Sequence, residues 1–236
     1  MSQLTLALRL RERAVFNSFV AGPNGAALEQ LQAIAQGAVR GMFWVSGPSG
    51  VGKSHLLQAV CAHARENKTE VTYLSLAQLT QFGPGVLDGW EASRIVALDD
   101  LQRVAGHGEW EQRLFGLYRE IEERAATLVA AANLPPLSLG FALPDLASRF
   151  AAATLISLHP LDDTAQREAL RLRALGRGLE LPEETARYLQ RRFPRNLSTL
   201  YELLDQIDEA ALRAQRRLTV PFIRDVLARY LPGEPG

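Results

Sequence analysis

One eight-residue segment, Gly47-Pro48-Ser49-Gly50-Val51-Gly52-Lys53-Ser54, constrains the fold of this chain more than any other. It follows the apolar run from Met42 to Val45 and precedes a segment with helical periodicity, so it predicts a strand, a tight loop and a helix. In such a loop, glycines let successive backbone N–H groups point at the β-phosphate of a nucleotide, and the helix N-terminus adds positive charge. The alternative is a glycine-rich turn that merely links a strand to a helix.

The side chains of this loop predict how phosphates and a metal ion are bound. Lys53 would reach the β- and γ-phosphate oxygens, and the Ser54 hydroxyl would bind Mg²⁺. We therefore expect a nucleoside triphosphate or diphosphate, ATP or ADP with Mg²⁺, as the ligand. The residues predicted to contact it here are Gly47, Gly50, Val51, Gly52, Lys53, Ser54 and His55.

Composition narrows the class of protein. The chain has 236 residues, of which 47% are hydrophobic, so it can bury a sizeable core. Its 26 Lys and Arg residues balance 26 Asp and Glu residues, which argues against tight binding to bulk DNA. The single cysteine, Cys61, excludes an internal disulfide, and no apolar run reaches the roughly 18 residues of a membrane span. We expect a soluble, cytoplasmic protein with no membrane partner.

Two patterns divide the chain. Short apolar runs alternate with helical periodicity up to about Leu158, which is typical of a parallel sheet covered by helices, whereas only helical segments follow Pro160. The predicted strands are 42–45, 71–76, 94–98, 127–131 and 154–158; the predicted late helices are 163–175, 182–193, 197–215 and 220–231. The pattern predicts an α/β nucleotide-binding core over 15–160 and a small all-α lid over 161–236.

Two carboxylates end the third predicted strand. Because the carboxyl edge of a parallel sheet is where open α/β folds bind ligands, Asp99 and Asp100 are placed near the predicted phosphate site. Asp99 would complete the Mg²⁺ shell opposite Ser54, and Asp100 would orient or activate an attacking water.

Two more polar residues follow later strands. Asn133 comes after the fourth strand, where it would contact the γ-phosphate or the water, although it also suits the turn before Leu134-Pro135-Pro136. Arg149 precedes the fifth strand, where its guanidinium would stabilise charge on a phosphoryl group held by a neighbouring molecule. Exposed arginines are common, so the sequence alone favours a solvated surface position for Arg149.

The order of these motifs resembles that of AAA+ ATPases, and within them the DnaA-related proteins. The stretch from Phe16 to Asn24 is similar to the segment that opens the DnaA ATPase module and cradles adenine, which implies that Phe19 and Val20 contact the base. The resemblance extends from Phe16 to Leu231 and implies an AAA+ core with a five-stranded parallel sheet followed by a helical lid.

The first residues, Gln3-Leu4-Thr5-Leu6-Ala7-Leu8, resemble the short peptide with which proteins bind the bacterial DNA polymerase sliding clamp. Gln3 would form a hydrogen bond at the mouth of a pocket, while Leu4, Leu6 and Leu8 would supply apolar anchors. The alternating leucines equally suit an edge strand. Residues 1–14 are thus predicted to be a clamp-binding peptide and linker, and this combination with a DnaA-like module is similar to the Hda family.

The resemblance to Hda implies negative regulation of chromosome replication initiation. Proteins of this family bind a clamp that encircles DNA and stimulate the hydrolysis of ATP held by DnaA, and Arg149 matches their arginine-finger position. The predicted partners are therefore DnaA, the clamp and, through the clamp, DNA in the nucleoid; self-association into a homo-oligomer is left open. The alternatives are a free-standing ATPase that loads a helicase or polymerase, and a non-enzymatic clamp adaptor.

One departure from the family pattern concerns the lid. Ser198 stands where DnaA-like lids carry an arginine that senses the γ-phosphate. Without that charge, ATP loses a contact that ADP never needs, so we expect weak discrimination for ATP and weak or no intrinsic ATPase activity.

Overall fold

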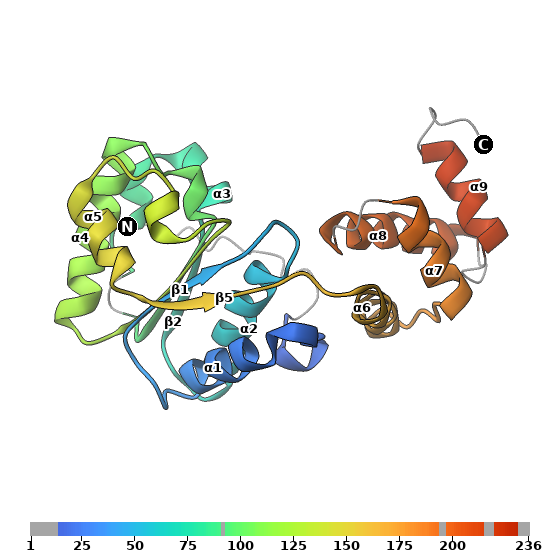
Figure 1. Cartoon of the computed structure of the whole chain (residues 1–236), viewed down its shortest axis with the longest axis horizontal. Helices are drawn as coiled ribbons and strands as arrows, with labels where there is room; N and C mark the ends of the chain where they lie inside the picture. The colour runs from blue at the N-terminus through green and yellow to red at the C-terminus, as the bar shows by residue number, and fades with distance from the viewer. Residues whose placement is uncertain (1–13, 91–92, 194–196, 215–219, 231–236) are drawn as a thin grey trace.

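The chain folds into a five-stranded parallel sheet with helices on both faces, followed by a helical lid (Figure 1). The computed structural model describes residues 14–90, 93–193, 197–214 and 220–230. Each neighbouring pair of strands is parallel, in the order β2-β3-β4-β1-β5. The strands are β1 (Met42–Ser46), β2 (Val71–Ser75), β3 (Ile95–Asp99), β4 (Thr127–Ala132) and β5 (Thr154–Ser157). Each predicted strand is confirmed to within one residue at either end.

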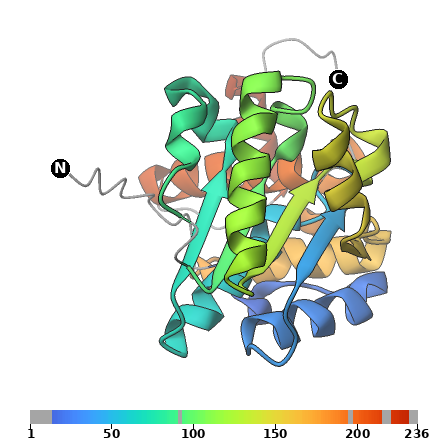
Figure 2. The same cartoon turned by 90° about the vertical axis from the view of Figure 1, so that its left-hand side faces the viewer.

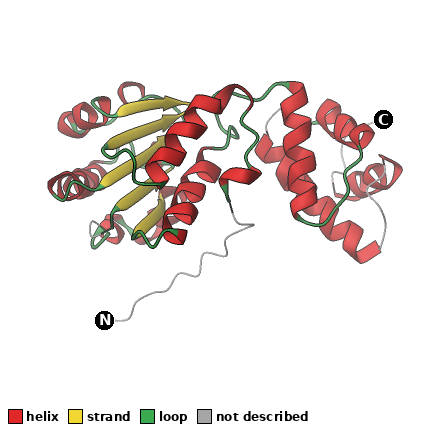
Figure 3. Cartoon of the chain, turned by 90° about the horizontal axis from the view of Figure 1, so that it is seen from below, coloured by secondary structure: helices red, strands yellow, loops and turns green. Residues whose placement is uncertain are grey.

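Successive residues of the strands point to opposite faces of the sheet, and helices cover both faces (Figure 3). The helices of this part are α1 (Gly25–Ala35), α2 (Lys53–Glu66), α3 (Leu76–Leu79), α4 (Gly108–Glu123) and α5 (Pro144–Ala151). Phe43, Val45 and Val129 pack with α1 and α2, whereas Trp44 and Leu128 pack with α3, α4 and α5. Figure 2 shows α4 lying across the strands on the second face. The interior strands are thus buried on both sides, which explains their continuous apolar sequences.

The lid has a hydrophobic core of its own. Its helices are α6 (Asp163–Gly176), α7 (Glu183–Arg192), α8 (Leu197–Ala214) and α9 (Val220–Tyr230), which confirms the four predicted late helices. Leu170 from α6, Leu189 from α7, Leu204 from α8 and Ile223 from α9 are all fully buried in this cluster. Within the described parts of the chain, no helix is long and apolar enough to cross a membrane.

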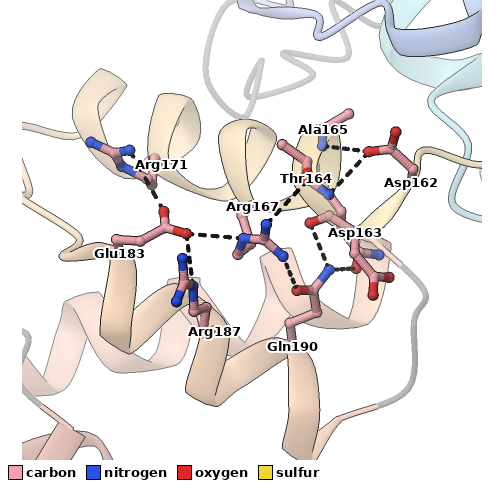
Figure 4. A network of polar contacts seen from close by, with 10 residues as sticks. Asp162, Asp163, Thr164, Ala165, Arg167, Arg171, Glu183, Arg187 and Gln190 are labelled. Atoms are coloured by element: carbon pink, nitrogen blue, oxygen red, sulfur yellow. Dashed lines mark hydrogen bonds and ion pairs between the residues drawn. The ribbon is translucent and has the colours of Figure 1, made fainter.

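Polar contacts hold the first two lid helices together (Figure 4). The guanidinium of Arg167 in α6 donates to Glu183 Oε1 at 3.1 Å and to Gln190 Oε1 at 2.9 Å, both in α7. Gln190 in turn donates to the backbone carbonyl of Asp163 at 2.9 Å. At the start of α6, the Asp162 carboxylate caps the helix by accepting two backbone N–H groups. These bonds fix α6 and α7 as one unit at the junction with the sheet.

A buried asparagine ties the segment before α1 to the segment that leads into the lid. The Asn24 side chain donates to the carbonyl of His159 at 3.0 Å and accepts from the His159 N–H at 2.7 Å. Nearby, a Cβ added to Gly22 would lie 2.7 Å from a Leu161 methyl group, so the backbone passes closely over the entrance to the lid. The segment before α1 thus sets where the lid begins.

Three helices on the sheet end in left-handed backbone conformations at the edge remote from the phosphate-binding loop. The residues concerned are Gly37 after α1, Lys68 after α2 and Ala125 after α4, with φ angles of 73°, 58° and 49°. Each allows the 6→1 backbone hydrogen bond that closes a helix C-terminus, such as Ala126 N to Ile121 O. The sequence uses glycine at only one of these three positions, so the other two carry backbone strain.

Ala125→Gly is therefore expected to raise the free energy of unfolding by about 1 kcal/mol, because glycine adopts the left-handed conformation without a Cβ penalty. Gly37→Ala should lower it by about the same amount. No atom lies within 4 Å of a Cβ added at Gly37, so this control reports backbone strain alone. Urea denaturation of both variants measures the effect, and a lower midpoint for Ala125→Gly would contradict this account.

Candidate nucleotide site

The phosphate-binding loop joins β1 to α2 at the carboxyl edge of the sheet, as the sequence predicts. Gly50 and Gly52 have φ angles of 83° and 100°, which favour glycine. Gly47 is required for another reason: a Cβ there would lie 2.5 Å from the carbonyl oxygen of Leu158, just after β5. The backbone can therefore curl around a phosphate only with glycine at these positions.

The segment before α1 packs directly against this loop. A Cβ at Gly52 would meet the Phe19 ring at 2.6 Å, so the ring lies on the glycine. The ring of His55, in the first turn of α2, lies 5.9 Å from the Phe19 ring between centroids, and its Nε2 lies 3.1 Å from the carbonyl of Val15. Val20 follows Phe19 and is half-buried. The predicted base-contacting segment and the phosphate-binding loop are thus brought together.

Burial lowers the pKa of His55, and the positive charge of Arg173 in the lid lowers it further, against the effect of the Val15 carbonyl. The lowered pKa favours the neutral imidazole beside the predicted base site. The segment before α1 also packs against the lid, since a Cβ at Gly22 would lie 3.6 Å from Ala165 of α6, so this end of the site lies between the sheet and the lid.

Lys53 folds back over the loop. Its ammonium donates to the carbonyls of Gly47 at 2.7 Å and Pro48 at 2.9 Å, and the residue is 8% exposed. Burial lowers the pKa of Lys53, while the charges of Asp99 and Asp100 raise it. A phosphate would offer this cation a stronger acceptor than two carbonyls, because hydrogen bonds between ionised groups are roughly twice as strong as neutral ones.

Asp99 is the most enclosed charge of the site, at 1% exposed. Its carboxylate accepts hydrogen bonds from Tyr73 Oη at 2.7 Å and from the Asp100 N–H at 2.9 Å, and the hydroxyl of Ser54 lies nearby. Burial raises the pKa of Asp99, whereas the hydroxyls of Ser54 and Tyr73 lower it. A serine hydroxyl beside a buried carboxylate is a donor set that suits Mg²⁺, so Ser54 and Asp99 fit the predicted metal site.

The residues predicted to handle the attacking water lie at the same edge. Asp100 adopts a left-handed conformation with φ 64° and ψ 39°, and its carboxylate accepts a hydrogen bond from Gln102 at 2.9 Å. Asn133 directly follows β4 and is exposed. β4 lies between β3 and β1, so Asn133 stands between the carboxylates and the loop.

Arg149 lies apart from this site, on α5, and its guanidinium faces α4. It donates to both carboxylate oxygens of Glu122, at 3.1 and 3.3 Å, and the two side chains are 49% and 45% exposed. The next residue, Phe150, is buried, and its ring packs against that of Trp44 with 5.1 Å between centroids and an interplanar angle of 55°. A half-exposed arginine is thus held on a helix whose other face is anchored in the core.

Some of the predicted residues lie outside the part of the chain that the structure describes. These include Gln3, Leu4, Leu6 and Leu8. Ser198 lies in the first turn of α8, but its side chain is likewise outside the described part.

Sequence reasoning did not identify three polar residues that shape the site. Tyr73 lies in β2 and reaches Asp99, and Gln58 of α2 donates to the Tyr73 hydroxyl at 3.2 Å. Asn24 clamps the segment before the lid. A buried asparagine has no sequence signal, but Tyr73 sits one pleat from the end of a strand, which could have indicated a side chain near the carboxyl edge.

Two family models match separate parts of the chain. Residues 163–227 match the lid domain of Hda, and residues 10–83 match the bacterial DnaA ATPase domain.

Solved structures support the same fold. Domain III of the replication initiation protein DnaA from Thermotoga maritima is 21% identical, with a TM-score of 0.77 over 93% of this chain and 98% of that one. AMPPCP-bound DnaA from Aquifex aeolicus is 19% identical, with a TM-score of 0.70 over 92% of this chain and 68% of that one. The RuvB branch migration motor of Thermotoga maritima is 16% identical, with a TM-score of 0.62 over 86% and 68%. The predicted α/β AAA+ fold with a helical lid is confirmed.

The pH at which Mg²⁺-dependent nucleotide binding is lost should depend on Tyr73. If Mg²⁺ binds the carboxylate of Asp99, as the sequence predicts, its affinity should fall as the pH drops through the pKa of Asp99, which burial raises. Tyr73→Phe removes a donor that favours the carboxylate, so the loss should begin at a higher pH than in the wild type.

A fluorescent ADP analogue titrated at several pH values, with Mg²⁺ and with EDTA, measures this shift. Tyr188→Phe, on the half-buried tyrosine of α7, is the matched control. Identical Mg²⁺-dependent profiles for Tyr73→Phe and the wild type would rule out this role.

Proposed function

We propose that this chain, a DnaA-related AAA+ protein similar to Hda, is a negative regulator of bacterial replication initiation that stimulates hydrolysis of ATP held by DnaA. The observation that carries the proposal is the position of Arg149: exposed on α5, outside the chain's own nucleotide site, and attached to the core through Phe150. An arginine so placed can reach a phosphate only on another molecule. The match of the lid to that of Hda supports the same direction of action.

The chain's own site would bind ADP or ATP with Mg²⁺ as a structural switch. Two of the similar DnaA structures contain the ATP analogue AMPPCP, which favours an adenine nucleotide here. Phosphates would contact the loop and Lys53, while Phe19, Val20 and His55 lie where they would contact the base. Because this region adjoins both the sheet and the lid, a bound nucleotide would favour one arrangement of the two.

The ion pair between Arg149 and Glu122 supports a finger that is released on contact. Exposed ion pairs contribute only about 0–1 kcal/mol, so the guanidinium can exchange Glu122 for the stronger acceptor offered by a phosphate. Glu122 would meanwhile keep the arginine extended along the surface of α4.

Contact with the sliding clamp would come from residues 1–14. In the proposed arrangement, Gln3, Leu4, Leu6 and Leu8 fill a groove on the clamp, and the rest of the segment links it to the core. The clamp, rather than this neutral chain, would then supply the contact with DNA in the cytoplasm.

A helicase or polymerase loader that uses its own ATPase activity is the second candidate. The observation that favours it is the presence of Asp100 and Asn133 at the carboxyl edge of the chain's own sheet. Measured hydrolysis separates the two: a loader turns over its own ATP, whereas the regulator accelerates turnover on DnaA.

Arg149→Ala is expected to lower the stimulated hydrolysis of DnaA-bound ATP by roughly a thousandfold or more, because it removes the charge offered to the transferring phosphoryl group. The assay follows radiolabelled ATP preloaded on DnaA in the presence of clamp loaded on DNA. ADP affinity and clamp binding of the variant should equal those of the wild type.

Arg187→Ala is the matched control, because Arg187 is also an exposed arginine in an ion pair, on α7 of the lid. It should stimulate like the wild type. The proposal fails if the wild-type protein gives no stimulation, or if Arg149→Ala retains it.

Deleting residues 3–8 should abolish capture of the protein by immobilised clamp while leaving its ADP affinity unchanged, because the peptide lies ahead of the described nucleotide site. Pull-down and calorimetry on the same preparation measure the two properties. Retained capture would show that another surface binds the clamp.

A further inference from the structure

The fully buried carboxylate of Glu111 accepts hydrogen bonds from two loops. One loop follows Asp100, and the other precedes α5, the helix that carries Arg149. Glu111 lies in the first turn of α4 and is 0% exposed. Its Oε1 accepts the N–H groups of Gly106 at 2.6 Å and Ala142 at 3.0 Å, and its Oε2 accepts the N–H of Leu143 at 2.6 Å. Three backbone donors from two loops thus converge on one side chain.

Among side chains of this shape, only a carboxylate can accept all three of these hydrogen bonds. Burying a charged group is unfavourable unless hydrogen bonds replace its hydration, and backbone N–H groups need acceptors when water is excluded. Glu111 offers acceptor atoms only, and the N-terminus of α4 adds a favourable dipole. Glutamine could not substitute, because its amide NH₂ would face at least one N–H donor.

The first loop begins at the predicted metal and water residues. After Asp100, a short 3₁₀ turn is closed by the bond from the Arg103 N–H to the Asp100 carbonyl, and the segment reaches Gly106. Gly106 has a φ angle of 83°, which directs its N–H toward Glu111. A change at Asp100 can therefore reach Glu111 through only a few residues.

The second loop leads to the arginine. Ala142 and Leu143 immediately precede Pro144, the first residue of α5, and Arg149 lies five residues further along that helix. Because α5 is only eight residues long, the direction in which it leaves Leu143 sets where the Arg149 side chain begins.

We propose that Glu111 is a positioning residue that couples the loop after Asp100 to α5 and so fixes how Arg149 is presented to the partner's nucleotide. The role in presentation rests on the proposed function, whereas the coupling itself is a property of this chain. A nucleotide bound at Asp99 and Asp100 would order the first loop, and Glu111 would transmit that order to the start of α5.

Hydrogen exchange on the wild-type protein tests the coupling without any variant. The amides of Ala142 and Leu143 should exchange more slowly than that of the exposed neighbour Gly140, and Mg²⁺-ADP should slow them further. Rapid exchange of both amides, or no response to Mg²⁺-ADP, would overturn the coupling whether or not the protein acts on DnaA.

Glu111→Gln tests the positioning, with Glu109→Gln as the matched control because Glu109 is an exposed carboxylate in the same helix turn. At saturating concentration, Glu111→Gln should lower the stimulated rate of DnaA-bound ATP hydrolysis roughly tenfold to a hundredfold, since a misplacement of about 1 Å costs on that order. Its ADP affinity should stay within about twofold of wild type, as for any group outside the ligand contacts. Glu109→Gln should match the wild type in both.

The stimulated rate at saturating concentration, the plateau, distinguishes a misplaced Arg149 from a loss of folded protein. If Glu111→Gln merely unfolded part of the sample, adding more of it would restore the full rate; a misdirected Arg149 leaves the plateau low at any concentration. A restored plateau, or an unchanged rate, would refute the positioning role. If the wild type itself fails to stimulate, the proposed function falls, and the exchange measurements still decide whether Glu111 couples the loops.

Discussion

The burial of a parallel sheet on both faces is the constraint on which the rest of this structure depends. α1 and α2 cover one face and α3, α4 and α5 the other, and the interior strands β1, β3 and β4 are apolar except at their ends. In these three strands, polar side chains stand only at the strand ends. β1, β3 and β4 are parallel and end at one edge, so the loop with Lys53, the Asp99 carboxylate and Asn133 meet there.

At that edge, burial disfavours the charged forms of Asp99 and Lys53, and neighbouring polar or charged groups favour them. Asp99 is nearly inaccessible, and burial raises its pKa while the hydroxyls of Ser54 and Tyr73 lower it. Lys53 is also buried, and burial lowers its pKa while the two carboxylates raise it. Each charge therefore depends on the others, and a phosphate with its metal ion would satisfy both signs at once. This mutual dependence suits a site whose ligand determines the conformation.

Contacts on the second face of the sheet hold α5 in place. Trp44 in β1 packs against Phe150 in α5, and the Trp44 indole donates to the Leu134 carbonyl at 3.0 Å in the loop before that helix. With Glu111 holding the last residues of the same loop, α5 is attached at both ends. The candidate nucleotide site, between sheet and lid, is thus separate from the anchored helix that carries Arg149 on its exposed side.

The sequence by itself determined the strands and the four lid helices, because local hydrophobic periodicity predicts them. It also determined the phosphate-binding loop and the carboxylates after β3, because these belong to a motif of fixed spacing and to the end of a buried strand. It predicted that Ser54 and Asp99 would be neighbours, since parallel strands share one carboxyl edge. Tyr73 on Asp99, Asn24 on His159 and Glu111 on the start of α5 were decided only by the tertiary structure. These contacts join residues 26, 135 and 31–32 positions apart, and no local pattern encodes them. Hydrogen-bond partners of buried polar groups depend on which loops the packed sheet brings together, and that is settled only when the chain is folded.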